Sequence, residues 1–208
     1  MLWDKFTDFW QGRLYLRRLD FFEDEQEGRW PEGVEKLLFD PQAKNPQAQK
    51  DALEAQRKAT FVSCWTMGHA DQVRMWQTYI GDRAGVAVQV RYRDLQASLH
   101  GSGHDLALGG VRCTDRIDSE WVRRHPRSNT LVLAFQKRCS YEWEREVRVV
   151  LQIPEHDTEG DSRTVPIDLG ILQPRLVVGQ KTDEKQISWL RSAITTSPGT
   201  ELVVSTLG

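Results

Sequence analysis

The chain has 208 residues and a mass of 24.0 kDa, which is the size of one domain. Its 28 Lys and Arg residues nearly balance its 30 Asp and Glu residues, and the formal net charge of −2 disfavours a dedicated duplex-DNA coat protein. The sequence lacks a signal-peptide pattern and any apolar run approaching the ~20 residues of a membrane span. We therefore expect a cytoplasmic protein that contacts no membrane.

The three cysteines are far apart in the sequence and odd in number: Cys64, Cys113 and Cys139. A disulfide framework or a four-thiolate zinc site would need closer, paired spacing, and the five histidines form no recognised ligand pattern. The sequence therefore predicts no structural metal.

Hydrophobic periodicity and capping residues predict the elements of the first half of the chain. Trp3, Phe6 and Trp10 have helical spacing, and Asn45 followed by Pro46 is typical of a helix start. In chain order we expect a helix over residues 3–10, a strand over 13–19, an acidic turn over 20–28, a helix over 46–59, a strand over 60–66, a helix over 70–80 and a strand over 85–92.

In the second half of the chain, strands outnumber helices and do not alternate with them regularly. In chain order we expect a strand over 111–113, a basic helix over 116–125, a segment open between strand and helix over 130–137, strands over 144–153, 164–168 and 175–179, a helix over 183–195 and a strand over 202–205. This order favours an α+β fold: a single compact domain over residues 1–208 with a mixed, mostly antiparallel sheet.

The most informative segment contains a row of alternating glutamates. In an extended chain, Glu142, Glu144 and Glu146 point to one side, and Arg148 continues the row. One interpretation is a solvated strand face whose charges neutralise one another. The other is a carboxylate pair beside cations, which can hold a ribose hydroxyl and stabilise positive charge growing at an anomeric carbon.

A second group of residues combines hydroxyl and aromatic side chains. Ser63 and Trp65 lie on one expected strand, and Trp76 and Tyr79 lie on the helix that follows it. These residues form either ordinary core or a pocket with hydrogen-bonding groups and a stacking surface.

The first expected strand carries neighbouring arginines. Arg17 and Arg18 point to opposite faces of that strand, so at least one of them is free to clamp a phosphate or to pair with the acidic turn.

Four blocks of the sequence resemble the bacterial domain-of-unknown-function 2971 family. The blocks cover residues 14–28, 61–66, 75–88 and 137–148, and together they span most of the chain. The most specific motifs are Phe61-Val62-Ser63-Cys64-Trp65-Thr66, Met75-Trp76-Gln77-Thr78-Tyr79 and Tyr141-Glu142-Trp143-Glu144-Arg145-Glu146-Val147-Arg148. The family name carries no activity, so this resemblance by itself assigns no reaction.

The order of the blocks is also similar to that in arginine–serine–glutamate ADP-ribosyltransferases. This similarity implies an ADP-ribosyltransferase-like sheet that takes NAD as its substrate, and no metal. It implies that Arg17 or Arg18 holds the diphosphate and that Ser63 shapes the nicotinamide pocket.

The same similarity assigns catalytic roles to two glutamates. Glu146 would support the oxocarbenium-like transition state, and Glu144 would position the acceptor, which is a protein or an RNA. Four aromatic residues complete the implied nucleotide site: Trp65, Trp76, Tyr79 and Tyr141. Such an enzyme would act as an effector in bacterial stress or phage defence.

The main alternative is a non-catalytic nucleotide-sensing or protein-interaction module of a defence or toxin–antitoxin system, with a partner protein from the same operon. Its glutamates would then be ion-pair partners of Arg145, Arg148 or the first-strand arginines. A third interpretation, a metal-dependent nuclease, needs carboxylates converging from separate strands beside a lysine, and Lys137 is well placed for that role.

Overall fold

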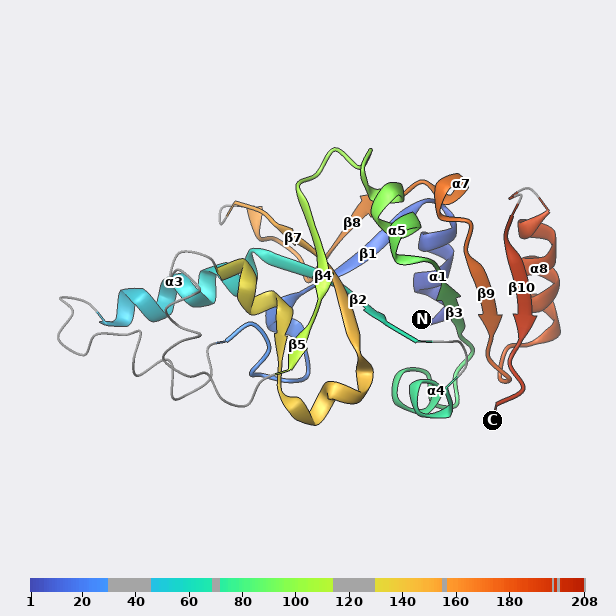
Figure 1. The fold of residues 1–208 in the computed structure, drawn as a ribbon, viewed down its shortest axis with the longest axis horizontal. Helices are drawn as coiled ribbons and strands as arrows, with labels where there is room; N and C mark the ends of the chain where they lie inside the picture. Colours follow the sequence, from blue (N-terminus) through green and yellow to red (C-terminus); the bar gives the residue numbers. More distant parts are fainter. Residues whose placement is uncertain are drawn as a thin grey trace. The chain divides into compact units, whose positions relative to one another are not determined.

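In a computed structural model of residues 1–208, the described part of the chain contains three β-sheets (Figure 1). The structure describes the chain apart from residues 30–45, 69–71, 114–129, 155–156, 196, 198 and 208. Most of its strand pairs are antiparallel, which confirms the expected α+β fold with mostly antiparallel pairing. Within the described residues, no helix is both long and apolar enough to cross a membrane.

Contacts divide the chain into two compact units, each built from separate stretches of sequence. Unit 1 comprises Met1–Tyr15, Gly68–Gly103 and Thr164–Gly208, and unit 2 comprises Leu16–Met67 and His104–Arg163. Each unit therefore joins segments that are distant in the chain. A single domain over residues 1–208 stays a prediction.

The largest sheet has five strands in the order β4-β7-β2-β1-β8. The strands are β1 (Arg13–Arg18), β2 (Thr60–Thr66), β4 (Leu106–Gly110), β7 (Glu146–Gln152) and β8 (Ser162–Pro166). Strand β7 lies between β4 and β2 and pairs antiparallel with both, so that Arg148 is opposite Gly109 on one side and Cys64 on the other. Residues opposite one another share a face of the sheet.

Unit 2 also contains several elements outside this sheet. They are η1 (Leu19–Phe21), η2 (Thr130–Phe135), η3 (Cys139–Glu144), the parallel strands β5 (Arg112–Cys113) and β6 (Gln136–Lys137), and the longer helix α3 (Pro46–Lys58). Leu19 of η1 and Ala134 of η2 form a buried cluster with Val62 and Val150 of the sheet. This hydrophobic cluster lies next to the candidate functional site that is described below.

Unit 1 contains a three-stranded sheet in the order β10-β9-β3, with β9 in the middle (Figure 1). Its elements are α1 (Trp3–Trp10), α4 (Val73–Tyr79), β3 (Val86–Gln89), α5 (Tyr92–Leu99), α7 (Leu169–Leu172), β9 (Arg175–Val178), α8 (Glu184–Ile194) and β10 (Glu201–Val204). Helix α8 begins at a capping box, in which Asp183 and Gln186 each accept a backbone N–H of the other.

Several elements differ from the sequence-based expectation. Strand β3 ends at Gln89 and Tyr92 begins α5, because Leu95 and Leu99 are buried at helical spacing and override the alternation before them. Strand β4 and helix α7 were not expected. The expected basic helix over 116–125 lies outside the described residues.

The expectation of three glutamates on one extended strand is wrong. Glu142 and Glu144 belong to η3, and β7 begins only at Glu146. Arg145 adopts a left-handed conformation between these elements and breaks the extended run. Burial also excludes the solvated strand face for Glu144 and Glu146, which are 4% and 5% exposed.

Candidate functional site

Five charged side chains of unit 2 meet inside the protein and form what we call the charge network: Glu27, Lys137, Glu144, Glu146 and Arg148. They come from the turn after η1, from β6, from η3 and from β7. Their side chains are only 0–9% exposed, so water solvates them little. Each charge must therefore be compensated by other groups of the protein.

Arg148 is the centre of the charge network, and its side chain is fully buried. Its Nε and Nη2 donate to the two carboxylate oxygens of Glu146 at 2.7 and 3.1 Å, and Nη2 also donates to Glu27 at 2.9 Å. Its Nη1 donates to the carbonyl oxygen of Ala134 in η2 at 2.7 Å. The planar guanidinium thus ties β7 to both the turn and η2.

Lys137 joins the remaining carboxylates. Its Nζ donates to Glu144 at 2.6 Å and to Glu146 at 2.9 Å, and it lies 3.5 Å from an oxygen of Glu27. The same ammonium lies 4.8 Å from the ring centroid of Tyr141. One lysine therefore faces three carboxylates, and the side chain fills the position where they converge.

A left-handed residue brings two of these carboxylates together. Arg145 has φ 45° and ψ 54° and ends η3 immediately before β7 begins. L-residues adopt this conformation at a cost of roughly 1–2 kcal/mol. Its two neighbours in the chain, Glu144 and Glu146, both reach the Lys137 ammonium.

The turn that places Glu27 in the charge network packs closely against Leu19 at Gly28. Gly28 has φ 70°, and a Cβ built there would come within 2.4 Å of Leu19 Cδ2. Arg57 of α3 donates its Nε to the carbonyl oxygen of Glu27 at 3.0 Å. Leu19 and Arg57 therefore hold the turn on two sides. A larger residue at position 28 would displace the turn.

Burial and pairing shift the pKa values of the network in different directions. Burial raises the pKa of Glu27, although Arg148 and Lys137 act against this rise. Burial alone would also raise the pKa of Glu146, but the hydrogen bonds and charge of Arg148, with help from Lys137, hold that pKa below its usual value. The carboxylates outnumber the cations by three to two, and the negative charge of Glu27 is less favourable than that of Glu146.

Cys64 is the neighbour of the charge network on β2. It lies opposite Arg148 in the register, and its thiol donates a hydrogen bond to Glu146. The residue is exposed, although desolvation is the largest contribution to the pKa of its thiol. This desolvation and the negative charge of Glu146 raise the pKa of Cys64 well above its ordinary value. Cys64 therefore stays a protonated, weakly nucleophilic thiol at neutral pH.

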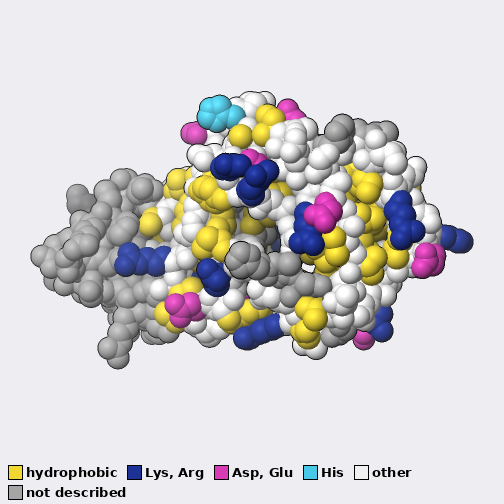
Figure 2. All heavy atoms as spheres, turned by 45° about the vertical axis from the view of Figure 1, so that its right-hand side comes forward, with side chains coloured by type: hydrophobic (Ala, Val, Ile, Leu, Met, Phe, Trp, Pro, Cys, Tyr) yellow, Lys and Arg dark blue, Asp and Glu magenta, His cyan; other side chains and the backbone are white. Residues whose placement is uncertain are grey.

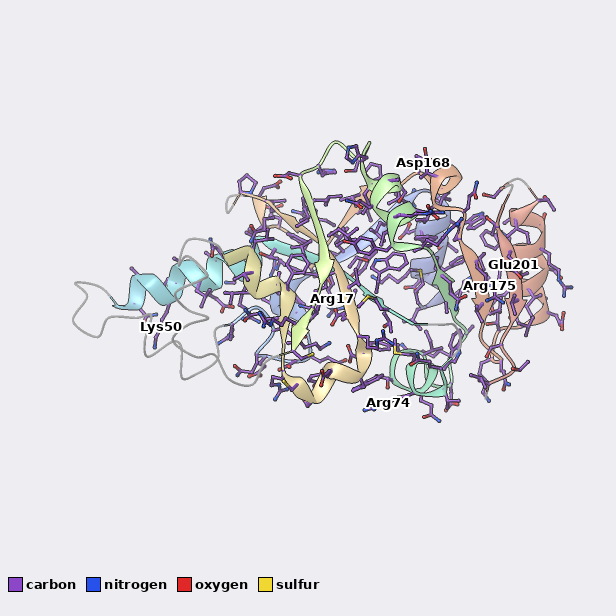
Figure 3. The ribbon with its side chains drawn as sticks, viewed as in Figure 1. Arg17, Lys50, Arg74, Asp168, Arg175 and Glu201 are labelled. Carbon is purple, nitrogen blue, oxygen red and sulfur yellow. The ribbon has the colours of Figure 1, made fainter. Side chains whose placement is uncertain are left out.

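The first-strand arginines have different surroundings. Arg18 donates to both oxygens of Asp20 at 2.7 and 3.1 Å and to the carbonyl oxygens of Thr158 and Gly160 at 2.7 and 2.6 Å. Arg17, labelled in Figure 3, is exposed, and its Nε donates to the carbonyl oxygen of Phe21 at 3.1 Å. Of the two, Arg17 has the guanidinium more accessible to a ligand.

The other expected binding residues belong to different elements. Ser63 and Trp65 lie opposite Val149 and Val147, so they occupy the face of β2 that points away from Glu146. Trp76 and Tyr79 belong to α4 of unit 1, whereas Tyr141 lies in η3 beneath the Lys137 ammonium. The ring of Tyr141 therefore adjoins the charge network.

Sequence reasoning missed Glu27 and Lys137 as members of the site. Glu27 is one of several acidic residues in its turn, and only the following Gly28 distinguishes its place in the sequence. In the sequence, Lys137 is well placed for a metal-dependent nuclease, which needs carboxylates free to bind a metal ion. Among the described residues, no group of three or more His, Cys, Asp or Glu side chains is placed to hold a metal.

Comparisons with known proteins offer no assignment for this site. No protein-family model, no curated protein and no solved structure matches the chain. The function is therefore inferred from the geometry of the charge network and of the exposed side chains.

Proposed function

We propose that this chain is a non-catalytic protein-interaction module, in which the row of glutamates is structural. The observation that carries the proposal is the internal pairing of the charge network. Arg148 and Lys137 engage Glu27, Glu144 and Glu146 at 2.6–3.5 Å with side chains that are 0–9% exposed. A carboxylate that stabilises a developing cation must face the substrate, and these carboxylates face cations of their own chain.

The exposed side chains support a protein partner over a nucleotide. Eight large hydrophobic residues of the described chain are 38–48% exposed: Phe21, Met67, Val73, Tyr79, Tyr92, Ile171, Trp189 and Val204. Aromatic residues and methionine are enriched in protein–protein interfaces. Helix α4, which carries Val73 and Tyr79, buries none of its residues. On the face in Figure 2, Lys and Arg side chains are scattered among hydrophobic ones and do not form a basic patch.

A second candidate is the NAD-dependent ADP-ribosyltransferase implied by the order of the sequence blocks. One observation favours it: Glu144 and Glu146 converge on one point beside an aromatic ring, that of Tyr141. In that case the pair would have to leave Lys137 to reach NAD. Arg17 would be the residue that binds the diphosphate, because Arg18 is already bound to Asp20 and to two carbonyl oxygens.

One set of variants separates the two functions. Nicotinamide release from NAD, NAD binding by calorimetry up to millimolar ligand, and the thermal midpoint would be measured on wild type, Glu144→Gln and Glu146→Gln. Glu142→Gln is the matched control, because Glu142 lies in the same 3-10 helix but is exposed. A structural network predicts no nicotinamide release and no NAD binding. It also predicts midpoints that fall in the two buried variants and not in the control.

The transferase predicts the opposite pattern. Wild type would release nicotinamide, and Glu146→Gln would lose about 10²–10³ in rate with an unchanged midpoint, because the charge acts only in the transition state. That pattern would overturn the interaction module.

The partner itself is tested by co-expressing the chain with the proteins encoded beside it. Co-elution of one of them in a stoichiometric complex on size exclusion supports the module. Elution of the chain alone from every such pair would contradict it.

A further inference from the structure

Two cysteines that are far apart in the sequence are close neighbours in unit 2. Cys113 ends β5 and Cys139 begins η3, and β5 contacts both β6 and η3. Neither is in a disulfide, and both residues are partly exposed. No local sequence pattern pairs them, because their proximity depends on the parallel pairing of β5 with β6.

The register also sets the direction of the two side chains. Cys113 is directly opposite Lys137 in the parallel pair, so these residues point to the same side. Arg138, with φ −64° and ψ 145°, keeps the chain extended between Lys137 and Cys139. Cys139 therefore points to the same side as Lys137 and is the diagonal neighbour of Cys113.

The electrostatics of Cys113 agree with this placement. Its pKa is raised first by burial and then by the charges of Cys139 and Glu142, while Lys137 acts in the opposite direction. A thiolate affects the pKa of another thiol only when the two groups are near each other. Its raised pKa keeps Cys113 protonated at neutral pH, which suits the role of the resolving thiol.

We propose that Cys113 and Cys139 form an intramolecular disulfide when a peroxide oxidises this protein. The Cys139 thiolate attacks one peroxide oxygen, the O–O bond breaks, and water leaves after protonation, which gives a sulfenic acid at Cys139. The Cys113 sulfur then attacks the Cys139 sulfur, the S–O bond breaks and a second water leaves. Two thiols lose two electrons and two protons, and the peroxide is reduced to two waters.

Formation of the Cys113–Cys139 disulfide would affect the charge network through η3. Diagonal neighbours in a sheet lie about 7–8 Å apart, with their Cβ atoms somewhat closer, whereas the Cβ atoms of a disulfide lie about 3.5–4.5 Å apart. The start of η3 must therefore move toward β5. The other end of η3 carries Glu144, which is bound to Lys137 at 2.6 Å. We expect the oxidised protein to have a lower thermal midpoint than the reduced protein, because this movement strains the contact between Glu144 and Lys137.

The experiment is peroxide treatment of the full chain, followed by blocking of free thiols and non-reducing peptide mapping. The result expected is a mass loss of about two units and a link between the peptides that contain Cys113 and Cys139. Cys64 escapes oxidation, because its raised pKa keeps it protonated, and it is alkylated once the protein is unfolded for blocking. The free thiols fall from three to one per molecule.

Serine variants make the assignment specific. Cys64→Ser must still form the link, and Cys113→Ser and Cys139→Ser must both lose it. The midpoints of the reduced variants show that each remains folded, and Cys113→Ala replaces Cys113→Ser if that variant does not fold. A link that involves Cys64, a disulfide between two molecules, or oxidation to sulfinic acid without any link would overturn the proposal.

Discussion

Arginine–carboxylate pairs occur in two contrasting regions of this protein. In unit 2, Arg148 and Glu146 meet at 2.7 Å with side chains 0% and 4% exposed. In unit 1, Arg175 and Glu201 lie on neighbouring strands β9 and β10 and meet at 3.1 Å with side chains 42% and 65% exposed (Figure 3). The chemistry is the same, but water compensates the surface charges and only protein compensates the buried ones. Removing one partner should therefore have very different effects in the two regions.

The largest expected effect is the loss of the buried guanidinium. Arg148→Met leaves Glu27 and Glu146 without their main cation, and we expect the free energy of unfolding to fall by about 3–5 kcal/mol. Glu201→Gln, the surface comparison, should change it by about 0–1 kcal/mol. Urea denaturation of both variants measures the difference. A loss below about 1 kcal/mol in Arg148→Met would show that the buried pairing contributes no more than a surface pair.

An intermediate effect is the pH dependence of the free energy of unfolding, which differs in sign between two carboxylates of the charge network. The folded protein holds a proton on Glu27 to a higher pH than the unfolded chain, because its pKa is raised. Glu27 therefore favours folding most at pH values below its ordinary pKa, and this contribution is lost as the pH rises through the raised pKa. The lowered pKa of Glu146 acts in reverse, so its contribution is lost as the pH falls below the ordinary carboxyl pKa.

Glu27→Gln isolates the first contribution. The amide carries no charge at any pH, so the stability of wild type relative to this variant should decline as the pH rises from about 4.5 toward 8. Glu27→Gln leaves two carboxylates facing two cations. It should therefore cost less at neutral pH than Glu146→Gln, measured by urea denaturation across that range. A pH-independent difference between wild type and Glu27→Gln would show that Glu27 is not the strained member of the network.

The smallest expected effect is a gain in stability at the junction of η3 and β7. Arg145 is exposed and left-handed, so Arg145→Gly removes backbone strain, and the greater freedom of glycine in the unfolded chain offsets part of the benefit. We expect a gain of up to about 1 kcal/mol in the free energy of unfolding. Gln173→Gly, at the other left-handed non-glycine residue of the described chain, is the matched control and should behave alike. A clear loss in Arg145→Gly alone would mean that the arginine side chain helps to hold the site.

The sequence predicted local features well and long-range ones poorly. The helix over 183–195 could be predicted because its capping residues and its buried face are close in the chain, and both are seen in α8. Glu27 and Arg148, by contrast, are 121 residues apart and are joined by a hydrogen bond between side chains. Nothing in either local sequence indicates the partner. The row of glutamates was recognised as unusual, but periodicity could not reveal the turn at Arg145.

The most direct test of the central claim is a pair of double-mutant cycles measured by urea denaturation. The first cycle combines Lys137→Met with Glu144→Gln, whose side chains meet at 2.6 Å inside the network. The second combines Arg175→Met with Glu201→Gln at the surface. A structural charge network predicts a coupling energy of about 1–3 kcal/mol in the first cycle and no more than about 0.5 kcal/mol in the second. Equal coupling energies in the two cycles would contradict the claim that these glutamates serve the fold.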